Sequence, residues 1–354
     1  MNDQDAIALL RRMVEIPSLS GDERSIATFL VSTMERLGFD ARIDEAGNAV
    51  GVIGDGPTTG VLLGHMDTVA GEIPVRVEDG KLYGRGSVDA KGPLAAFIAG
   101  ATRAHAAGTL AARIVVVGCV EEEAPSSKGA RHVTPHLNPD WCVNGEPSGW
   151  DGITLGYKGF LRAHLRWSQG SAHSAHAART VCERAVRGWS RIESAVRDFN
   201  EGRERLFDQL LPALVGMESQ AVESTDVAEL RMNLRLPPDL SPDHAATWLT
   251  AQVPDVDVEI LGGLPAWSGP RTTLLHRHLF RSIRKVGGRA RYQLKTGTAD
   301  LNIVAPAWGC PALAYGPGDA ALDHTPDEHM VLDEYLRGIQ VIEGLLAAAD
   351  QISS

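Results

Sequence analysis

The first part of the chain switches between helical and strand-like spacing of its apolar residues. Residues 3–15 place Ile7, Leu10 and Val14 on one helix face, and residues 22–37 repeat that spacing before Gly38. Short apolar runs then follow, in NAVGVIG, GVLLGHMD and ARIVVVGCVEEE, and the helical segment PLAAFIAGATRAHAAG separates the last two. Strands and helices that alternate in this way predict βαβ units and a mostly parallel sheet.

The pattern changes after residue 157. FLRAHLRWSQ and VAELRMNLRLPP alternate like half-exposed strands, and AARTVCERAVRGWSRIESAVRDF between them predicts a long amphipathic helix. Apolar runs and helices of the first kind return after residue 264. We therefore expect an α/β fold with a mixed, mostly parallel sheet flanked by helices. Its main domain would be discontinuous, from residues 1–157 and 265–354, with a smaller α+β domain inserted at 158–264.

Composition narrows the class of protein. Of 354 residues, 44% are hydrophobic and 22% charged, which is typical of a globular protein. The net charge of −11 argues against nucleic acid as a partner. Asp3 and Asp5 stand where a signal peptide would carry basic residues, and no apolar run is long enough to span a membrane. We therefore expect a cytoplasmic protein with neither a nucleic-acid nor a membrane partner.

One segment is basic although the chain as a whole carries a net negative charge. Residues 260–299 contain no Asp or Glu. This charge pattern fits a solvated helix face balanced by acids elsewhere, or a docking surface at 271–295 for an acidic partner. The basic residues in it are Arg271, Arg277, Arg281, Arg284, Lys285, Arg289, Arg291 and Lys295.

Imidazole and carboxylate side chains gather where the apolar runs end. In open α/β sheets, ligand sites form at the carboxyl ends of the strands. Singly, each residue has an ordinary alternative, such as a loop histidine, a helix N-cap for Asp89 or an acidic loop for the glutamates. Together they can hold two metal ions, bridged by Asp89, with one glutamate taking a proton from water. The residues are His65, Asp67, Asp89, Glu121, Glu122, Glu123, Glu146 and His324.

The order of these motifs carries a resemblance to a known family. GHMD, GRGSVDAKG, EEE followed by SKGAR, GEPS and a late histidine resemble the ArgE/DapE family of zinc metallohydrolases over nearly the whole chain. The resemblance implies an amidohydrolase with two zinc ions, for which cobalt can substitute. It assigns Asp89 as the bridge, His65 and Glu146 to one ion, and Glu123 and His324 to the other.

The resemblance also assigns the residues around the ions. Glu122 would be the general base, and Asp67 would orient His65. A one-residue slip, with Glu121 as base and Glu122 as ligand, stays open because three glutamates are adjacent.

The inserted domain would be the lid and dimerisation domain of a homodimer. In SQGSAHSAH, His173 matches the family's lid histidine, which reaches across the dimer to stabilise the oxyanion of the intermediate. His176 is the local rival, and either one fits an ordinary surface histidine.

Two strings indicate a substrate within the family. GEPSGWDGITLGYKG and KTGTADLN are most similar to hydrolases that release lysine or ornithine from an acidic amino-group carrier protein in lysine and arginine biosynthesis. Alternatives are a carrier pathway with another cargo in secondary metabolism, an N-acetylornithine or N-acyl-diamino-acid deacylase acting on free small molecules, and a non-catalytic binding protein. Candidates for holding the amino-acid end, or else a plain loop, are Lys295, Thr298, Asp300 and Asn302.

Overall fold

The computed structural model describes residues 1–171 and 179–352. The chain divides into two compact units. The first comprises Met1–Gly156, Gly269–Gln293 and Ala299–Ser354, and the second comprises Tyr157–Ser268 and Leu294–Thr298. The boundaries expected from the sequence lie close to these, except that Leu294–Thr298 groups with the second unit.

The largest sheet contains nine strands among the described residues. Their order is β1-β2-β6-β3-β7-β15-β8-β13, and β14 also pairs with β8. The central strands β6, β3, β7 and β15 pair in parallel, which confirms the mostly parallel sheet. The strands are β1 (Asp40–Ile43), β2 (Ala49–Ile53), β3 (Thr59–His65), β6 (Arg113–Cys119), β7 (Trp141–Asn144), β8 (Gly152–Tyr157), β13 (Trp267–Ser268), β14 (Arg291–Lys295) and β15 (Ala312–Ala314).

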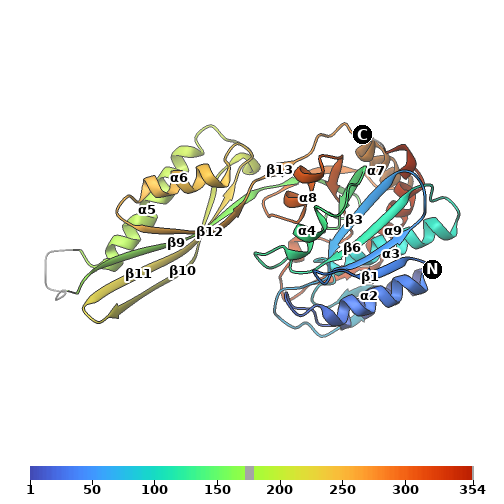
Figure 1. Cartoon of the computed structure of the whole chain (residues 1–354), viewed down its shortest axis with the longest axis horizontal. Helices are drawn as coiled ribbons and strands as arrows, with labels where there is room; N and C mark the ends of the chain where they lie inside the picture. Colours follow the sequence, from blue (N-terminus) through green and yellow to red (C-terminus); the bar gives the residue numbers. More distant parts are fainter. Residues whose placement is uncertain (172–178, 353–354) are drawn as a thin grey trace. The chain divides into compact units, whose positions relative to one another are not determined.

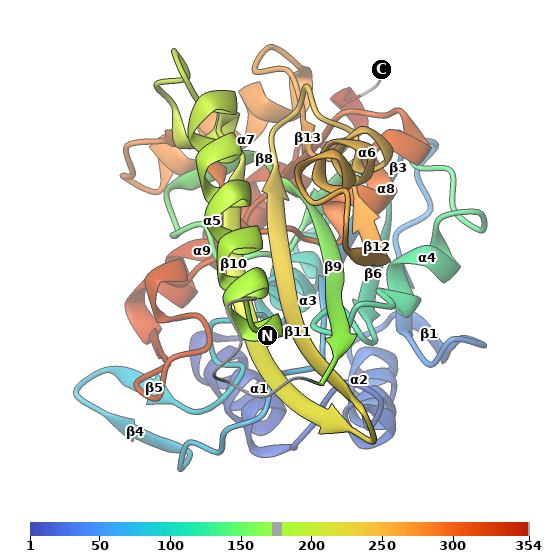
Figure 2. The same cartoon turned by 90° about the vertical axis from the view of Figure 1, so that its left-hand side faces the viewer.

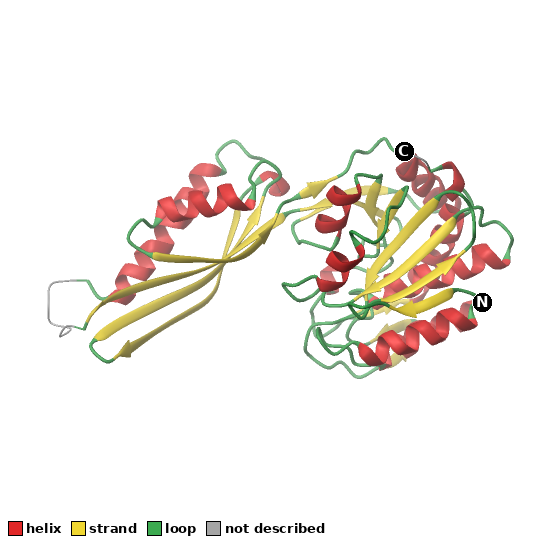
Figure 3. Ribbon diagram, in the orientation of Figure 1, coloured by secondary structure: helices red, strands yellow, loops and turns green. Residues whose placement is uncertain are grey.

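Helices cover this sheet because its central strands are apolar on both faces. Helix α3 is buried along almost its whole length, since it packs against β3 and β6 and against α1 and α9. Figure 1 and Figure 3 show these layers within the first unit. Its helices are α1 (Asp3–Glu15), α2 (Arg24–Arg36), α3 (Lys91–Ala106), α4 (Lys128–Val133), α7 (Leu274–Lys285), α8 (Leu301–Trp308) and α9 (Leu332–Leu346).

The first unit also contains a small three-stranded sheet. Its order is β16-β5-β4, from β16 (His329–Val331), β5 (Lys81–Tyr83) and β4 (Arg76–Glu78). Short 3-10 helices occur at Leu206–Asp208, Ala320–Leu322 and Ala349–Gln351. The sheet joins a segment near the C-terminus to one in the first quarter of the chain.

The second unit is an antiparallel sheet with two helices on one face (Figure 2). The strand order is β10-β11-β9-β12, formed by Leu211–Val222, Thr225–Leu236, Gly159–Gly170 and Asp257–Leu264. Alternate residues of β9 are buried, as the sequence pattern predicts for a half-exposed strand. Helices α5 (Val181–Phe199) and α6 (Pro242–Gln252) pack on that apolar face.

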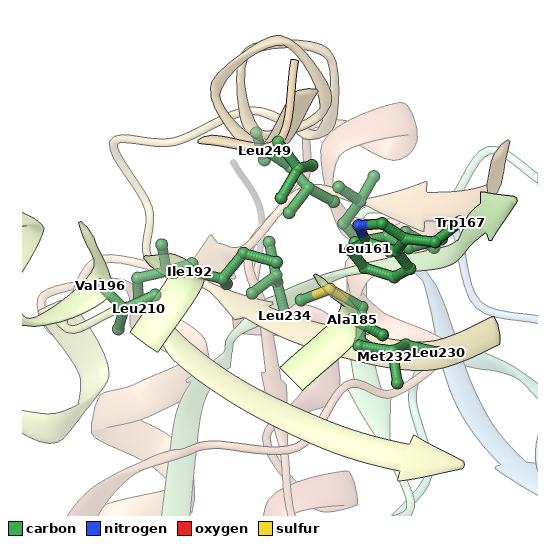
Figure 4. Close-up of a cluster of buried hydrophobic side chains, with 14 of the residues drawn as sticks. Leu161, Trp167, Ala185, Ile192, Val196, Leu210, Leu230, Met232, Leu234 and Leu249 are labelled. Atoms are coloured by element: carbon green, nitrogen blue, oxygen red, sulfur yellow. The ribbon is translucent and has the colours of Figure 1, made fainter. Parts of the chain in front are cut away.

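The core of the second unit is continuous across the sheet and both helices (Figure 4). Trp167 from β9 and Leu234 from β11 meet Ile192 from α5 and Leu249 from α6. Helix α5 begins with a reciprocal cap between Thr180 and Glu183, which satisfies backbone donors at its N-terminus. This unit therefore has a hydrophobic core of its own.

Among the helices that the structure describes, each is too short or too polar to cross a lipid bilayer. The cytoplasmic location stays a prediction.

Candidate active site

The parallel register of three central strands brings the candidate site residues to one sheet edge. His65, the last residue of β3, is the register partner of Cys119, the last residue of β6. The three adjacent glutamates begin two residues after Cys119, and Glu146 lies two residues after β7 ends at Asn144. Residues from separate parts of the sequence thus meet where the carboxyl ends of the strands meet.

The carboxylate of Asp89 lies between two imidazoles. Its Oδ1 is 3.1 Å from Nε2 of His65, and its Oδ2 is 3.1 Å from Nε2 of His324. The same His324 nitrogen is 2.9 Å from Oε1 of Glu123. Ligand atoms of His65, Asp89 and Glu123 all lie within 4.8 Å of one another. A carboxylate that presents each oxygen to a different imidazole has the donor arrangement of a ligand that bridges two cations.

The tautomer of His65 is set by a backbone carbonyl. Its Nδ1 is 3.0 Å from the Asp67 carbonyl oxygen and 3.4 Å from the Asp67 Oδ1. Because a carbonyl only accepts, Nδ1 carries the hydrogen and donates it, which leaves the Nε2 lone pair for a cation. His65 is almost fully buried. Asp67 thus contacts His65, and its predicted orienting role stays a prediction.

Asp67 has a further role that the sequence did not predict. Its Oδ1 accepts a hydrogen bond from the backbone N–H of Glu122 at 3.1 Å, and its Oδ2 accepts one from that of Glu123 at 3.0 Å. Ser20 Oγ also donates to Oδ2, at 2.7 Å. Asp67 therefore contacts His65 through its backbone carbonyl and its carboxylate, and the same carboxylate fixes the turn that carries both glutamates.

The turn separates the three glutamates. Glu123 contacts His324, whereas Glu121 accepts a hydrogen bond from Ser126 Oγ at 2.6 Å and lies 3.6 Å from the Lys128 ammonium. The charges of His65 and Glu146 act on Glu122. The assignment of Glu122 as base and Glu123 as ligand stays a prediction.

Burial and mutual charge perturb the titration of these groups. Burial raises the pKa of Glu122 well above its ordinary value; His65 lowers it, and nearby carboxylates, Glu146 first, raise it. Burial lowers the pKa of His65, but Asp67 and Asp89 outweigh it and hold that pKa well above its usual range. Hydrogen bonds to Asp89 and Glu123 raise the pKa of His324 to about 10. Such crowded carboxylates at a sheet edge are typical of a site that binds cations.

The donor set fits divalent metal ions. Imidazole nitrogens and carboxylate oxygens are ligands that zinc, cobalt and manganese share. His65, Asp89 and Glu123 supply three of them at close range. His324 adds a second imidazole, and the half-buried Glu122 lies beside them.

The four residues expected to hold the amino-acid end of a substrate lie in different environments. Asp300 and Asn302 are buried, at 2% exposed each, and Asn302 Oδ1 accepts from the Ala299 N–H. Burial raises the pKa of Asp300 to about 7. The role of Asp300 and Asn302 in holding a substrate stays a prediction.

Lys295 and Thr298 belong to the second unit. There, the Arg235 guanidinium donates to Thr298 Oγ1 at 3.0 Å. Burial, and then the positive charge of Arg162, lower the pKa of Arg235. Two neighbouring guanidiniums can bind a carboxylate, and only the three-dimensional pairing of the strands reveals them. His173 and His176 lie outside the described residues.

The family follows from comparison with known sequences. Residues 61–348 match the model of peptidase family M20/M25/M40. The chain belongs to this family. M20 family members are metal-dependent hydrolases, which agrees with the donor set at the sheet edge.

Relatives within the M20 family extend over almost the whole chain. The LysW-lysine hydrolase of Deinococcus radiodurans is 46% identical over 97% of this chain and 96% of its own length. A putative LysW-lysine/LysW-ornithine hydrolase of Thermococcus kodakarensis is 41% identical over 97% of this chain and 91% of its own. These identities confirm the family resemblance read from the motifs.

Solved structures share the fold at much lower identity. A metallo-carboxypeptidase of Sulfolobus solfataricus aligns over 99% of this chain and 100% of its own, with a TM-score of 0.82 and 19% identity. Human carnosine dipeptidase 1 aligns over 99% of this chain and 97% of its own, with a TM-score of 0.76 and 16% identity. The α/β fold is thereby confirmed.

Divalent ions should stabilise the folded protein through Asp89. Adding Zn²⁺ or Co²⁺ to metal-free protein is expected to raise Tm, because ligand binding to the native state adds about 4 kcal/mol at a thousandfold excess over Kd. Asp89→Ala should abolish most of the rise in a thermal melt. The control Asp319→Ala removes an exposed carboxylate that caps a 3-10 turn. This variant should show the same rise in Tm as wild type. An equal rise in Asp89→Ala and wild type would contradict the assignment.

Proposed function

We propose that this protein is a dinuclear metal-dependent amidohydrolase that releases lysine, or ornithine, from an amino-group carrier protein during amino-acid biosynthesis. The observation that carries the proposal is the 46% identity over nearly full length to a LysW-lysine hydrolase. The geometry around Asp89 supports it, because each of its oxygens faces an imidazole. The bond cut would be the amide between the side chain of the carrier's C-terminal glutamate and the α-amino group of the cargo.

The chain's own residues would hold two ions, most simply zinc. Asp89 would bridge them, His65 and Glu146 would complete one site, and Glu123 and His324 the other. When bound, such ions polarise a carbonyl and lower the pKa of water towards neutrality. Asp67 keeps the ligands in register, through His65 and the backbone of Glu123.

We assign the proton transfer to Glu122. It would take the proton of the attacking water and return it to the nitrogen of the departing amino acid. Burial raises the pKa of this carboxyl, and a base works best when its pKa lies near the working pH. The oxyanion role of His173 remains a proposal from the family resemblance.

Replacing the base should separate turnover from ion binding. In Glu122→Gln we expect kcat to fall by about 10² to 10⁴ fold, the range for losing a general base, while ion stoichiometry stays unchanged. Glu121→Gln, a matched change at a side chain bound to Ser126, should stay near wild type. Mass spectrometry can follow release from carrier-linked lysine, carrier-linked ornithine and acetylornithine.

The same assay decides between the functions. A higher kcat/KM for acetylornithine would replace the carrier reaction with deacylation of free small molecules. Turnover of none of the three, with tight binding, would indicate a binding protein on the same fold. Loss of activity in Glu121→Gln but not in Glu122→Gln would shift the register of base and ligand by one residue.

A homodimer is supported by the edge strand β10. It lies at the end of the second unit's sheet and exposes Leu214, Val215, Met217 and Val222, the second of them by 58%. A long, exposed, apolar edge strand offers unpaired backbone groups on which a strand of another chain can pair. We infer that a second copy of this protein covers it.

Disrupting that edge should yield monomers. Wild-type protein is expected to sediment as a dimer at micromolar concentration, and Val215→Lys as a monomer, because a lysine at an edge strand opposes pairing. Arg277→Glu changes an exposed charge on the first unit, outside the sheet that contains β10, and should leave the dimer intact. A monomeric wild type would refute the inference.

The basic surface of α7 is the proposed docking site for the acidic carrier. Arg277, Arg281, Arg284 and Lys285 are exposed on this helix. Within the described part of the chain, none of them forms an ion pair with a carboxylate. Unpaired cations of this kind raise the rate of encounter with an acidic partner.

Charge reversal tests this surface. Arg281→Glu with Arg284→Glu should raise KM for carrier-linked lysine by about tenfold, roughly 1.4 kcal/mol, and leave a small acyl-lysine unaffected. The matched control reverses Arg187 and Arg191 on α5, which are equally exposed. Equal losses on both substrates, or an equal effect of the α5 control, would remove the docking proposal.

A further inference from the structure

A buried carboxylate lies directly behind the loop that carries Asp89. Glu328 is 0% exposed. Its Oε1 accepts hydrogen bonds from the backbone N–H groups of Val88, at 2.9 Å, and Asp89, at 3.1 Å. Its Oε2 is 2.7 Å from Nη1 of Arg85. Three donors from one short segment, residues 85–89, therefore converge on a side chain about 240 positions later in the sequence.

These contacts and the positive charge of the nearby Lys91 offset the cost of burying this charge. An isolated buried carboxylate is strongly unfavourable, whereas a paired and hydrogen-bonded one is tolerated. Arg85 is itself held, because its Nε donates to the Gly71 carbonyl at 3.1 Å. An apolar side chain would fill the same space without this penalty. The polar contacts thus specify the conformation of the Asp89 loop rather than simply filling the interior.

Glu328 also belongs to the segment that carries the second imidazole. It stands four residues after His324 and directly before β16, which pairs with β5. The backbone N–H of Gly84 donates to the Glu328 carbonyl at 3.3 Å. Backbone and side chain of one residue therefore connect the His324 segment to the Asp89 loop.

We propose that Glu328 is a positioning residue for the metal centre. It keeps the Asp89 carboxylate and the His324 imidazole at the spacing that two ions require. Glu328 itself faces backbone N–H groups and Arg85, so it acts through Asp89 without touching ions or substrate. The proposal rests on the ion-binding part of the proposed function and is independent of which amide is cut.

The test is ion affinity, which does not depend on turnover. Metal-free Glu328→Gln and Glu328→Ala are titrated with Zn²⁺ or Co²⁺ against a competing chelator. Losing a partner that orients a metal ligand typically weakens ion binding by about 10 to 100 fold. We expect that loss in Glu328→Ala and a smaller one in Glu328→Gln, whose amide oxygen still accepts from the two N–H groups.

Two further variants extend the comparison. Glu334→Gln changes a partly buried carboxylate on α9, whose charged neighbours do not include Asp89, and should keep wild-type ion affinity. Arg85→Gln removes the partner of Glu328 and should weaken ion binding in the same direction as Glu328→Gln. Saturating ion concentration should restore kcat of Glu328→Gln, with KM unchanged throughout.

Some outcomes would overturn the proposal. The proposal is overturned if Glu328→Gln, Glu328→Ala and Arg85→Gln all bind ions as tightly as wild type. A lower Tm of the metal-free variants with unchanged ion affinity would also overturn it, since that result indicates a role in folding alone. If Glu328→Ala does not fold, the Gln variants decide. Failure of wild type to cleave carrier-linked substrate would refute the proposed function yet leave this comparison of affinities intact.

Discussion

The sharing of one carboxylate between two imidazoles is the constraint around which the site is built. Asp89 faces His65 on one oxygen and His324 on the other. These three residues come from different parts of the chain, so their meeting depends on the parallel alignment of β3 with its neighbours and on the small sheet that brings in the C-terminal segment. The fold therefore serves mainly to bring distant donors to a common edge.

Behind those donors lies a layer of buried acceptors. Asp67 fixes the glutamate turn through two backbone N–H groups, and Glu328 fixes the Asp89 loop in the same way. Both are carboxylates at 0% exposed that bind backbone rather than ligand. Local backbone geometry at the site is thus held by side chains from elsewhere in the chain, because turns of this kind lack a ladder of their own.

The sequence predicted the parts that local patterns encode. Continuous apolar runs such as that of β3 identified a buried parallel sheet, and the residues at the strand ends identified the donors. Contacts over long separations in sequence leave no such pattern. The pairing of Glu328 with Val88, the guanidinium of Arg235 beside Thr298, and the burial of Asp300 follow only from the packed chain. The burial of Asp300 could not be inferred from its motif, because a motif specifies residue type and not depth.

The contacts of Asp67 have a consequence for how substitutions combine. His65, Glu122 and Glu123 all depend on this one side chain. A change at Asp67 therefore displaces a ligand and a base together, and a later change at either of them removes something already lost. Free energies of single substitutions within this group will overlap rather than add, as is usual for residues in one network. Because these residues depend on one another, a substitution at one of them changes the effect of a substitution at the others.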